Sequence, residues 1–287
     1  MGAIFRHELR NYFHSLTAYV FGAFLLAVVG LGSVLYNLQA AVSNFEFVLS
    51  FASIIFVVIV PILTMRTLAE ERRQRTDQLL YSLPITTTQV VLGKYFALLV
   101  VYLIPLAVIS LYPLLFSQFG DVYLPTSYGS LFAFFMMGAA LLAVGMFLSS
   151  LTDNQGFAAG IGIAAILLNY YSVSLAEYTS STAMGSLIAL YVIALLLGVV
   201  IHNLTRNENL AYGVAFVLIA ALSVAYFVNS SAFEGLLPDI MTKLSLFRQF
   251  NSFVNGAFDL TAIVYYVSVM GFFLFLSVLS MEKRRYN

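Results

Sequence analysis

Long apolar runs, each of a length that can cross a lipid bilayer as a helix, dominate the sequence. Such a crossing takes about 20 residues, and a spanning segment must satisfy its backbone hydrogen bonds internally, so these runs are expected to be helices. Charged residues make up only 9% of the 287 residues, against about a quarter in soluble domains. The sequence therefore predicts an all-α, polytopic transmembrane bundle of about eight spans, at residues 16–36, 47–66, 90–116, 129–150, 157–176, 184–204, 211–229 and 261–281.

The positions of the basic residues predict the orientation of these spans. With an even number of spans, both termini lie on the same side of the membrane. Eleven of the thirteen Lys and Arg residues fall in segments on that side, and Lys243 and Arg248 fall on the other. Cytoplasmic loops carry an excess of Lys and Arg, so both termini are expected in the cytoplasm.

Two further segments have the periodicity of amphipathic surface helices. Residues 1–15 place apolar side chains opposite Arg6, Glu8 and Arg10, which predicts an N-terminal helix at the membrane interface. A frayed polar tail is the alternative. The apolar run that follows is long for a signal peptide and is interpreted as an uncleaved first span. Residues 230–260 are expected to hold an extracytoplasmic amphipathic helix, with apolar positions at Leu237, Ile240, Met241, Leu244, Phe247, Phe250 and Val254.

The sequence contains no recognisable constellation for covalent chemistry or metal binding. Cysteine is absent, and the three histidines are expected at the interface, two on the N-terminal helix and one at the end of the sixth span. No Ser, His and acid share a triad spacing. The pair Gly93-Lys94 is followed by Tyr95 and lacks the upstream glycine of a phosphate-binding loop. We therefore expect no catalytic residue, no bound metal or cofactor, no nucleotide hydrolysis by this chain and no nucleic-acid partner.

The centres of the predicted spans contain no ionisable side chain. Arg66 and Lys94 are placed at the cytoplasmic ends of their spans, where long side chains can extend to the interface. Charged side chains within a membrane usually mark ion paths or proton relays. Their absence from the predicted centres argues against an ion-coupled secondary transporter and against an intramembrane enzyme.

The densest charge in the chain follows the second predicted span, at Glu70–Arg75 (EERRQR), which we call the charged segment. Four leucines around it, of which Leu79 and Leu80 are adjacent, can share one side of a helix. Pro84 ends that helix, and Thr86 to Thr88 offer N-cap oxygens to the third span. An ordinary cytoplasmic loop needs basic residues alone, so the paired acids and leucines favour a docking helix on the cytoplasmic surface.

These motifs resemble those of the permease subunits of type-2 ATP-binding-cassette (ABC) exporters, in the branch that includes gliding-motility-type permeases. The family pattern is a second span, a stretch like EERRxxTxxxLLxxLPIT and a Gly-Lys that opens the third span, and Glu70–Lys94 is similar to it. The resemblance covers most of the chain. Further similar stretches are RHELRNYFHS near the N-terminus, SSLTDNQGFAA at Ser149–Ala159, FNSFVNGAFDLTAIVYY at Phe250–Tyr266, and EKRRY at the basic C-terminus.

The resemblance implies a single transmembrane permease domain over residues 1–287. Residues 1–15 would be its amphipathic lead-in, 67–86 its cytoplasmic coupling segment and 230–260 its extracytoplasmic segment. Residues 184–229 would be a helical pair beyond the six spans common in the family. In such exporters the coupling helix contacts the ATPase. The resemblance therefore implies these candidate contact residues: Glu70, Glu71, Arg72, Arg73, Leu79, Leu80 and Pro84.

The implied partners are two ABC ATPase subunits, which would bind ATP and Mg²⁺, a second permease that is a copy or a homologue, and membrane lipid. The implied location is the plasma membrane of a bacterium. The leading interpretation is a permease subunit that couples ATP hydrolysis in a separate subunit to export of a substrate. The alternative is a non-transporting membrane scaffold or assembly partner, whose charged segment docks another protein.

Overall fold

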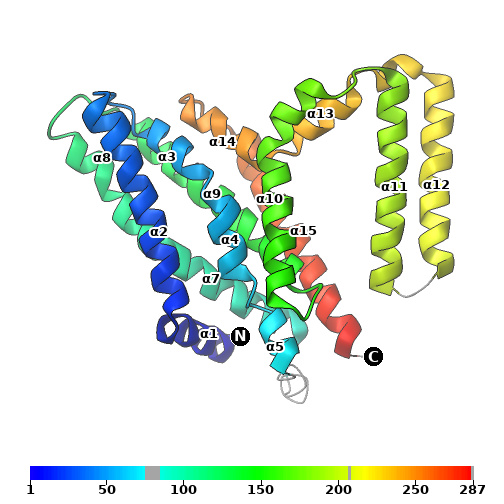
Figure 1. The fold of residues 1–287 in the computed structure, drawn as a ribbon, viewed down its shortest axis with the longest axis horizontal. Coiled ribbons are helices and arrows are strands. Elements are labelled where there is room, and N and C mark those ends of the chain that lie inside the picture. The colour runs from blue at the N-terminus through cyan, green and yellow to red at the C-terminus, as the bar shows by residue number, and fades with distance from the viewer. Residues whose placement is uncertain (75–84, 206–207, 286–287) are drawn as a thin grey trace. The chain divides into compact units, whose positions relative to one another are not determined.

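The computed structural model describes residues 1–74, 85–205 and 208–285, and within these ranges it contains helices and turns without strands (Figure 1). The predicted all-α fold is confirmed. The helices group into two compact units: one is formed by Met1–Tyr170 with Gln249–Arg285, and the other by Tyr171–Arg248.

The first unit contains the N-terminal helices and the C-terminal helix. They are α1 (Gly2–His14), α2 (Leu16–Gly32), the π-helical η1 (Ser33–Gln39), α3 (Phe45–Ser53), α4 (Phe56–Thr64), α5 (Ala69–Gln74), α7 (Thr87–Ile109), α8 (Leu111–Phe116), α9 (Leu124–Ser149) and α15 (Leu260–Arg285). Two helices, α10 (Gln155–Tyr178) and α14 (Leu246–Val254), belong to it in part.

Helix α9 is the centre of the first unit. It packs against α15, α4, α3 and α7, and it is the most buried of the described helices that could span a membrane. Small residues allow this packing, because a side chain at Gly138 would collide with Tyr102 of α7 and one at Gly145 with Thr64 of α4. The buried Tyr102 hydroxyl donates a 2.8 Å hydrogen bond to the Phe134 carbonyl of α9, which satisfies the polar end of its ring.

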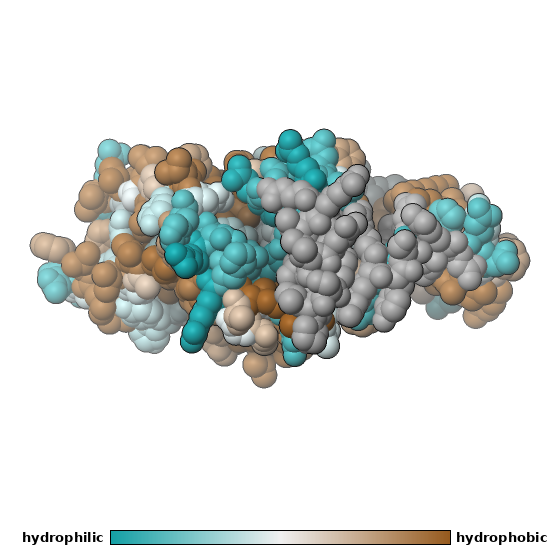
Figure 2. Space-filling model, turned by 90° about the horizontal axis from the view of Figure 1, so that it is seen from below, coloured by the Kyte–Doolittle hydropathy of each residue, from teal (hydrophilic) through white to brown (hydrophobic). Residues whose placement is uncertain are grey.

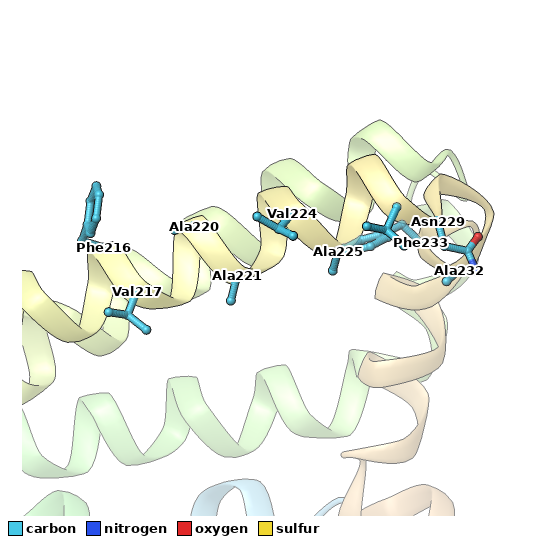
Figure 3. A pocket seen from close by; sticks show the side chains of 10 residues that line it. Phe216, Val217, Ala220, Ala221, Val224, Ala225, Asn229, Ala232 and Phe233 are labelled. Carbon is cyan, nitrogen blue, oxygen red and sulfur yellow. The ribbon is translucent and has the colours of Figure 1, made fainter.

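The second unit is built around two helices that lie side by side, α11 (Ala183–Thr205) and α12 (Glu208–Val228) (Figure 1). They are followed by the 3₁₀ turn η2 (Ser230–Phe233) and by α13 (Leu236–Lys243). The hydroxyls of Tyr191 and Ser223 join the pair at 2.6 Å. An apolar depression along α12, between Phe216 and Phe233, is lined mostly by alanines and valines (Figure 3).

The described helices make this a multi-pass membrane protein. By length and hydropathy, six of them can cross a bilayer: α2 continued by η1, α7 continued by α8, α9, α10, α12 and α15. Helices α3 and α4 form a seventh span if they are counted together, although they are bent by 57° where the helix breaks at Ile54 and Ile55. The remaining predicted span, 184–204, coincides with α11. The described apolar stretch of α11, Ala183–Val199, is shorter than the six helices that are long enough to cross a bilayer.

The two segments with amphipathic periodicity are both helical. Residues 1–15 form α1, and residues 230–260 form η2, α13 and α14 with a break at Leu244 and Ser245. The expectation that Glu8 shares a polar face with Arg6 and Arg10 is wrong, because Glu8 is only 9% exposed. Its carboxylate is turned toward a cation of α7, which is the centre of the candidate site.

Candidate functional site

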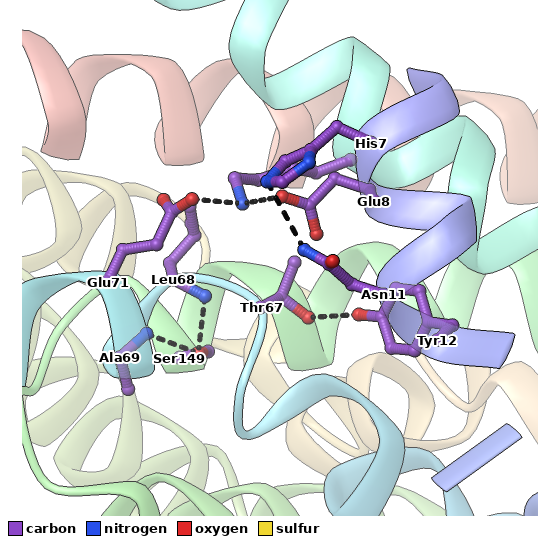
Figure 4. A network of polar contacts seen from close by, with 10 residues as sticks. His7, Glu8, Asn11, Tyr12, Thr67, Leu68, Ala69, Glu71 and Ser149 are labelled. Carbon is purple, nitrogen blue, oxygen red and sulfur yellow. Dashed lines mark hydrogen bonds and ion pairs between the residues drawn. The ribbon is translucent and has the colours of Figure 1, made fainter. Parts of the chain in front are cut away.

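Helix α1 lies against the beginning of α7, and the contact depends on a glycine. A Cβ added at Gly93 would lie 3.1 Å from Cγ2 of Ile4, closer than an ordinary carbon contact. The missing side chain therefore lets the backbones approach. One helical turn after Ile4, the same face of α1 presents Glu8 to Lys94, the neighbour of Gly93 in α7 (Figure 4).

Lys94 binds carboxylates from two other helices. Its Nζ donates hydrogen bonds of 2.7 Å to Oε1 of Glu8 in α1 and of 2.7 Å to Oε1 of Glu71 in α5. The side chain of Lys94 is 2% exposed, against 12% for Glu8 and 22% for Glu71. A buried ammonium without partners is strongly unfavourable, so the two carboxylates stabilise the ionised lysine at this position. We call Glu8, Glu71 and Lys94 the ionic cluster.

A second contact joins α1 to the turn between α4 and α5. The Tyr12 hydroxyl of α1 lies 3.3 Å from the Thr67 hydroxyl (Figure 4). Burial raises the pKa of the Tyr12 phenol well above its usual range, and nearby carboxylates, including Glu8, raise it further. Tyr12 therefore stays neutral at physiological pH and does not add a negative charge beside the ionic cluster.

Ser149, the last residue of α9, holds the start of α5. Its hydroxyl accepts hydrogen bonds from the backbone N–H groups of Leu68 at 3.3 Å and Ala69 at 3.2 Å, and donates one of 3.1 Å to the Met65 carbonyl. These N–H groups stand at a helix start, where no intrahelical acceptor is available. The central helix of the unit thus caps α5 through a side chain 80 residues away in the sequence.

The start of α7 is fixed in a similar way. Thr86 is its N-cap, and the Thr86 hydroxyl accepts a 3.3 Å hydrogen bond from the backbone N–H of Gln89, as the sequence predicted. The hydroxyl of Thr87 donates a 2.9 Å hydrogen bond to Oε1 of Glu282 near the end of α15. The helix that carries Lys94 is therefore held at its first turn by the C-terminal helix.

The structure places part of the predicted coupling set. Glu70 and Glu71 are half-buried on α5, and Arg73 on the same helix is exposed. Glu71 is the member that the structure joins to the ionic cluster. The backbone of Arg72 belongs to α5, but its side chain is outside the described part of the structure. The predicted contact residues Leu79, Leu80 and Pro84 are entirely outside the described residues.

Two members of the ionic cluster were not predicted as site residues. The expectation that Lys94 extends to the membrane interface is wrong, because its ammonium is enclosed between two carboxylates inside the protein. Glu8 was missed because it stands between Arg6 and Arg10 in the sequence, and this position predicted that all three side chains share an exposed polar face. The Gly-Lys pair was the available signal, since a glycine before a lysine permits the close approach that buries the lysine.

The end of the first unit at which α1 and α5 lie carries hydrophilic side chains among apolar ones (Figure 2). Exposed there are the arginines Arg6, Arg10 and Arg73. Within the described residues, no group of three or more His, Asp or Glu side chains is arranged to hold a metal ion. This end of the first unit therefore carries buried ion pairs beneath exposed arginines.

Residues 33–176, half of the chain, match the family model described as ABC-2 family transporter protein. The matched range begins in η1 and ends in α10, so it includes α5, Lys94 and Ser149. It excludes α1 and the pair α11 and α12. In a sequence comparison with curated proteins, nothing matches the chain.

Proposed function

Because the chain belongs to the ABC-2 family of transporter membrane proteins, we propose that it is the permease subunit of an ATP-driven exporter of the gliding-motility-type branch. The family supplies the multi-pass membrane component of an ABC transporter, which associates with an ABC ATPase and is not itself the ATPase. In the proposed mechanism, hydrolysis in that separate subunit moves α5 and the residues after it, and this movement opens a path for substrate.

The attachment of α5 to the membrane helices is the observation that carries the proposal. Helix α5 follows directly after the bent span of α3 and α4, and its Glu71 is bound by Lys94 of α7, which also binds Glu8 of α1. Charge-assisted hydrogen bonds of 2.7 Å have restricted geometry and resist displacement. A force applied to α5 would therefore act on α1, α4 and α7 together, and through Ser149 on α9.

The predicted coupling residues take different roles in this mechanism. Glu71 holds α5 to the permease through the ionic cluster. Glu70, Arg72 and Arg73 are proposed to set the register of the ATPase contact, because complementary charges orient an interface. Leu79, Leu80 and Pro84 are proposed to supply its buried apolar area.

The rest of the proposed assembly rests on the resemblance and on the distribution of basic residues. Two ATPase subunits bind ATP and Mg²⁺, and a second permease, a copy or a homologue, completes the path. Both termini and the charged segment lie in the cytoplasm of a bacterium, beneath its plasma membrane. The whole chain acts as one permease domain, with residues 67–86 as its coupling segment.

Co-purification from membranes with the ATPase encoded beside this gene tests the proposal. Wild type is compared with a variant in which Glu70–Arg75 is replaced by Gly-Ser residues. The matched control is Asp239→Ser with Lys243→Ser, which removes an exposed ion pair of 2.7 Å from α13. The expected result is an ATPase retained by wild type and by the control and lost from the segment variant.

The other outcomes have distinct meanings. Retention by the segment variant would contradict the coupling role of the charged segment and leave the transporter assignment intact. If no form of the chain retains the ATPase, the proposed function fails and the scaffold interpretation takes its place.

A further inference from the structure

A groove of about 500 Å³ lies between α2 and α4 in the first unit. Its size falls within the range of ligand pockets, roughly 300–1,000 Å³. Apolar side chains form most of its wall, and several are well exposed, as for Val20 at 57%, Phe24 at 50% and Val58 at 42%. Both helices belong to predicted spans, which places the groove at the depth of the bilayer, and its exposed side chains are open on the surface of this chain.

Two polar groups in this groove have no partner among the described residues. Arg66 and Thr17 line it, and neither the guanidinium nor the hydroxyl forms a hydrogen bond or an ion pair with the described residues. Arg66 is exposed, whereas the ammonium of Lys94 in the same unit is buried and bound by two carboxylates. The groove thus combines an apolar channel with an unpaired positive charge at the end of a span.

We propose that this groove binds an anionic phospholipid, with its phosphate on Arg66 and Thr17 and an acyl chain along the apolar wall. A guanidinium donates two parallel hydrogen bonds to phosphate oxygens, and a hydroxyl can donate a third. An arginine at the end of a span also lies at the level of the lipid headgroups. The ligand's charge and shape are therefore both complementary to the site.

The position of the site gives the bound lipid a structural consequence. Arg66 immediately precedes Thr67, whose hydroxyl contacts Tyr12 of α1, and it lies in the turn that leads into α5. A phosphate on Arg66 would hold this turn from the lipid side, while Ser149 holds it from the protein side. The site is independent of the ATPase contact and can be tested without it.

Any apolar helix surface in a bilayer is covered by lipid, so selectivity for the headgroup is the decisive measurement. The full chain, purified in detergent, is titrated with phosphatidylglycerol and with phosphatidylcholine, and retained lipid is counted by native mass spectrometry. Both lipids offer a phosphate to Arg66, but only phosphatidylglycerol has a net negative charge, because the choline cation neutralises the other headgroup. Wild type is therefore expected to hold phosphatidylglycerol about tenfold more tightly. Equal retention of the two lipids would overturn the proposal.

Two variants, each with a matched control, locate the site. Arg66→Gln is expected to abolish the preference, whereas Arg10→Gln, which removes an exposed cation outside the groove, keeps it. Val58→Trp fills the groove and is expected to lower retention of phosphatidylglycerol several-fold. Leu103→Trp on α7, equally exposed at 42% and outside the groove, leaves it unchanged.

The remaining outcomes also decide the question. A preference that survives Arg66→Gln, or a Val58→Trp variant that retains lipid as Leu103→Trp does, would place the binding elsewhere and overturn the proposal. Competition with inorganic phosphate separates a lipid from a free anion. If inorganic phosphate binds as tightly as phosphatidylglycerol does, the acyl chain contributes nothing to binding, the groove is a site for a soluble anion and the lipid assignment is wrong.

Discussion

At the scale of single residues, Lys94 combines deep burial with a full charge and depends on both of its partners. Lys94→Met removes the cation that binds both Glu8 and Glu71, and removing one partner of a buried ion pair costs about 3–5 kcal/mol. We expect the variant to unfold at a markedly lower temperature than wild type in detergent. The triple variant Lys94→Met, Glu8→Gln, Glu71→Gln should recover much of the loss, because no unpaired charge remains.

Thermal unfolding followed by size-exclusion chromatography measures this difference. Lys243→Met is the control, because Lys243 pairs with Asp239 on the surface and is 69% exposed. Exposed pairs contribute about 0–1 kcal/mol, so little change is expected there. A Lys94→Met variant as stable as the Lys243→Met control would show that the ionic cluster does not hold α1, α5 and α7 together.

Glu46, in the first turn of α3, is a buried acid that has few hydrogen-bond partners among the described residues, in contrast to Lys94, which two carboxylates bind. It is 2% exposed, its Oε1 lies 3.5 Å from the Ser127 hydroxyl, and its Oε2 has no partner among the described residues. An amide has nearly the same shape and no charge to desolvate. Glu46→Gln is therefore expected to leave the thermal stability unchanged or to raise it by about 1–3 kcal/mol.

The same unfolding assay checks this prediction. Glu46→Ala serves as the comparison, because it also removes the charge and leaves a cavity, which lowers stability. A loss of stability in Glu46→Gln equal to that in Glu46→Ala would mean that the ionised carboxylate itself is required.

At residue scale, the sequence could not have assembled the ionic cluster. Its hydrogen bonds join residues 86 and 23 positions apart, and no local pattern reports such pairings. Glu8 stands between arginines on an amphipathic segment and reads as a surface residue. Lys94 stands near a span end, where a lysine ordinarily extends to water. The N-cap of α7 at Thr86 was predictable because its hydrogen bond closes within three residues.

At the scale of elements, the contact of α1 with α7 depends on Gly93. Gly93→Leu would force its side chain into Ile4 and separate the two helices, and such overpacking costs about 1–3 kcal/mol. We expect reduced thermal stability, with part of the loss restored by Ile4→Ala. Gly160→Leu in α10 is the matched control, because nothing lies within 4 Å of a Cβ added there. Equal effects of the two leucines would argue against a specific contact at Gly93.

Helix α5 carries the prediction on coupling. Arg72→Glu with Arg73→Glu reverses two charges on α5 while leaving Glu71 and its bond to Lys94 in place. We expect membrane insertion to be intact and stimulation of the ATPase by the permease to fall to the basal rate, because like charges now oppose the docking. ATPase activity in proteoliposomes measures this, with Arg248→Glu as the control. Normal stimulation in the double variant would remove the coupling assignment.

The long helices were predictable, and their interruptions were not. Spans such as α7 and α9 follow from the length and hydropathy of the apolar run alone. The bend of 57° between α3 and α4 falls at Ile54 and Ile55, two apolar residues that give no sequence signal for a break. Contacts between segments distant in the sequence leave no local pattern either; at the far end of α4, for example, Gly145 of α9 accommodates Thr64.

At the scale of the whole molecule, the family match ends close to the point where the chain passes from the first unit to the second. The match ends at residue 176, and the second unit, which begins at Tyr171, holds α11 and α12. Helix α12 could span a membrane, and α11 lies beside it, so the two form a hairpin. With the predicted span 184–204 counted as a crossing, the hairpin crosses twice. Removing two spans leaves the orientation of every later span unchanged, whereas removing one span inverts it.

Deleting Ala183–Val228, with a short Gly-Ser linker from Thr182 to Asn229, tests whether the hairpin is needed for coupling. Because α5, the ionic cluster and α9 all belong to the first unit, we expect the shortened chain to insert, to keep its C-terminus on the same side of the membrane as in the full chain and to retain the proposed ATPase. A reporter fused to the C-terminus measures the orientation, and co-purification measures the retention. Deletion of α12 alone is the control and should invert the reporter. Loss of the ATPase from a correctly oriented hairpin deletion would instead make α11 and α12 part of the coupling apparatus.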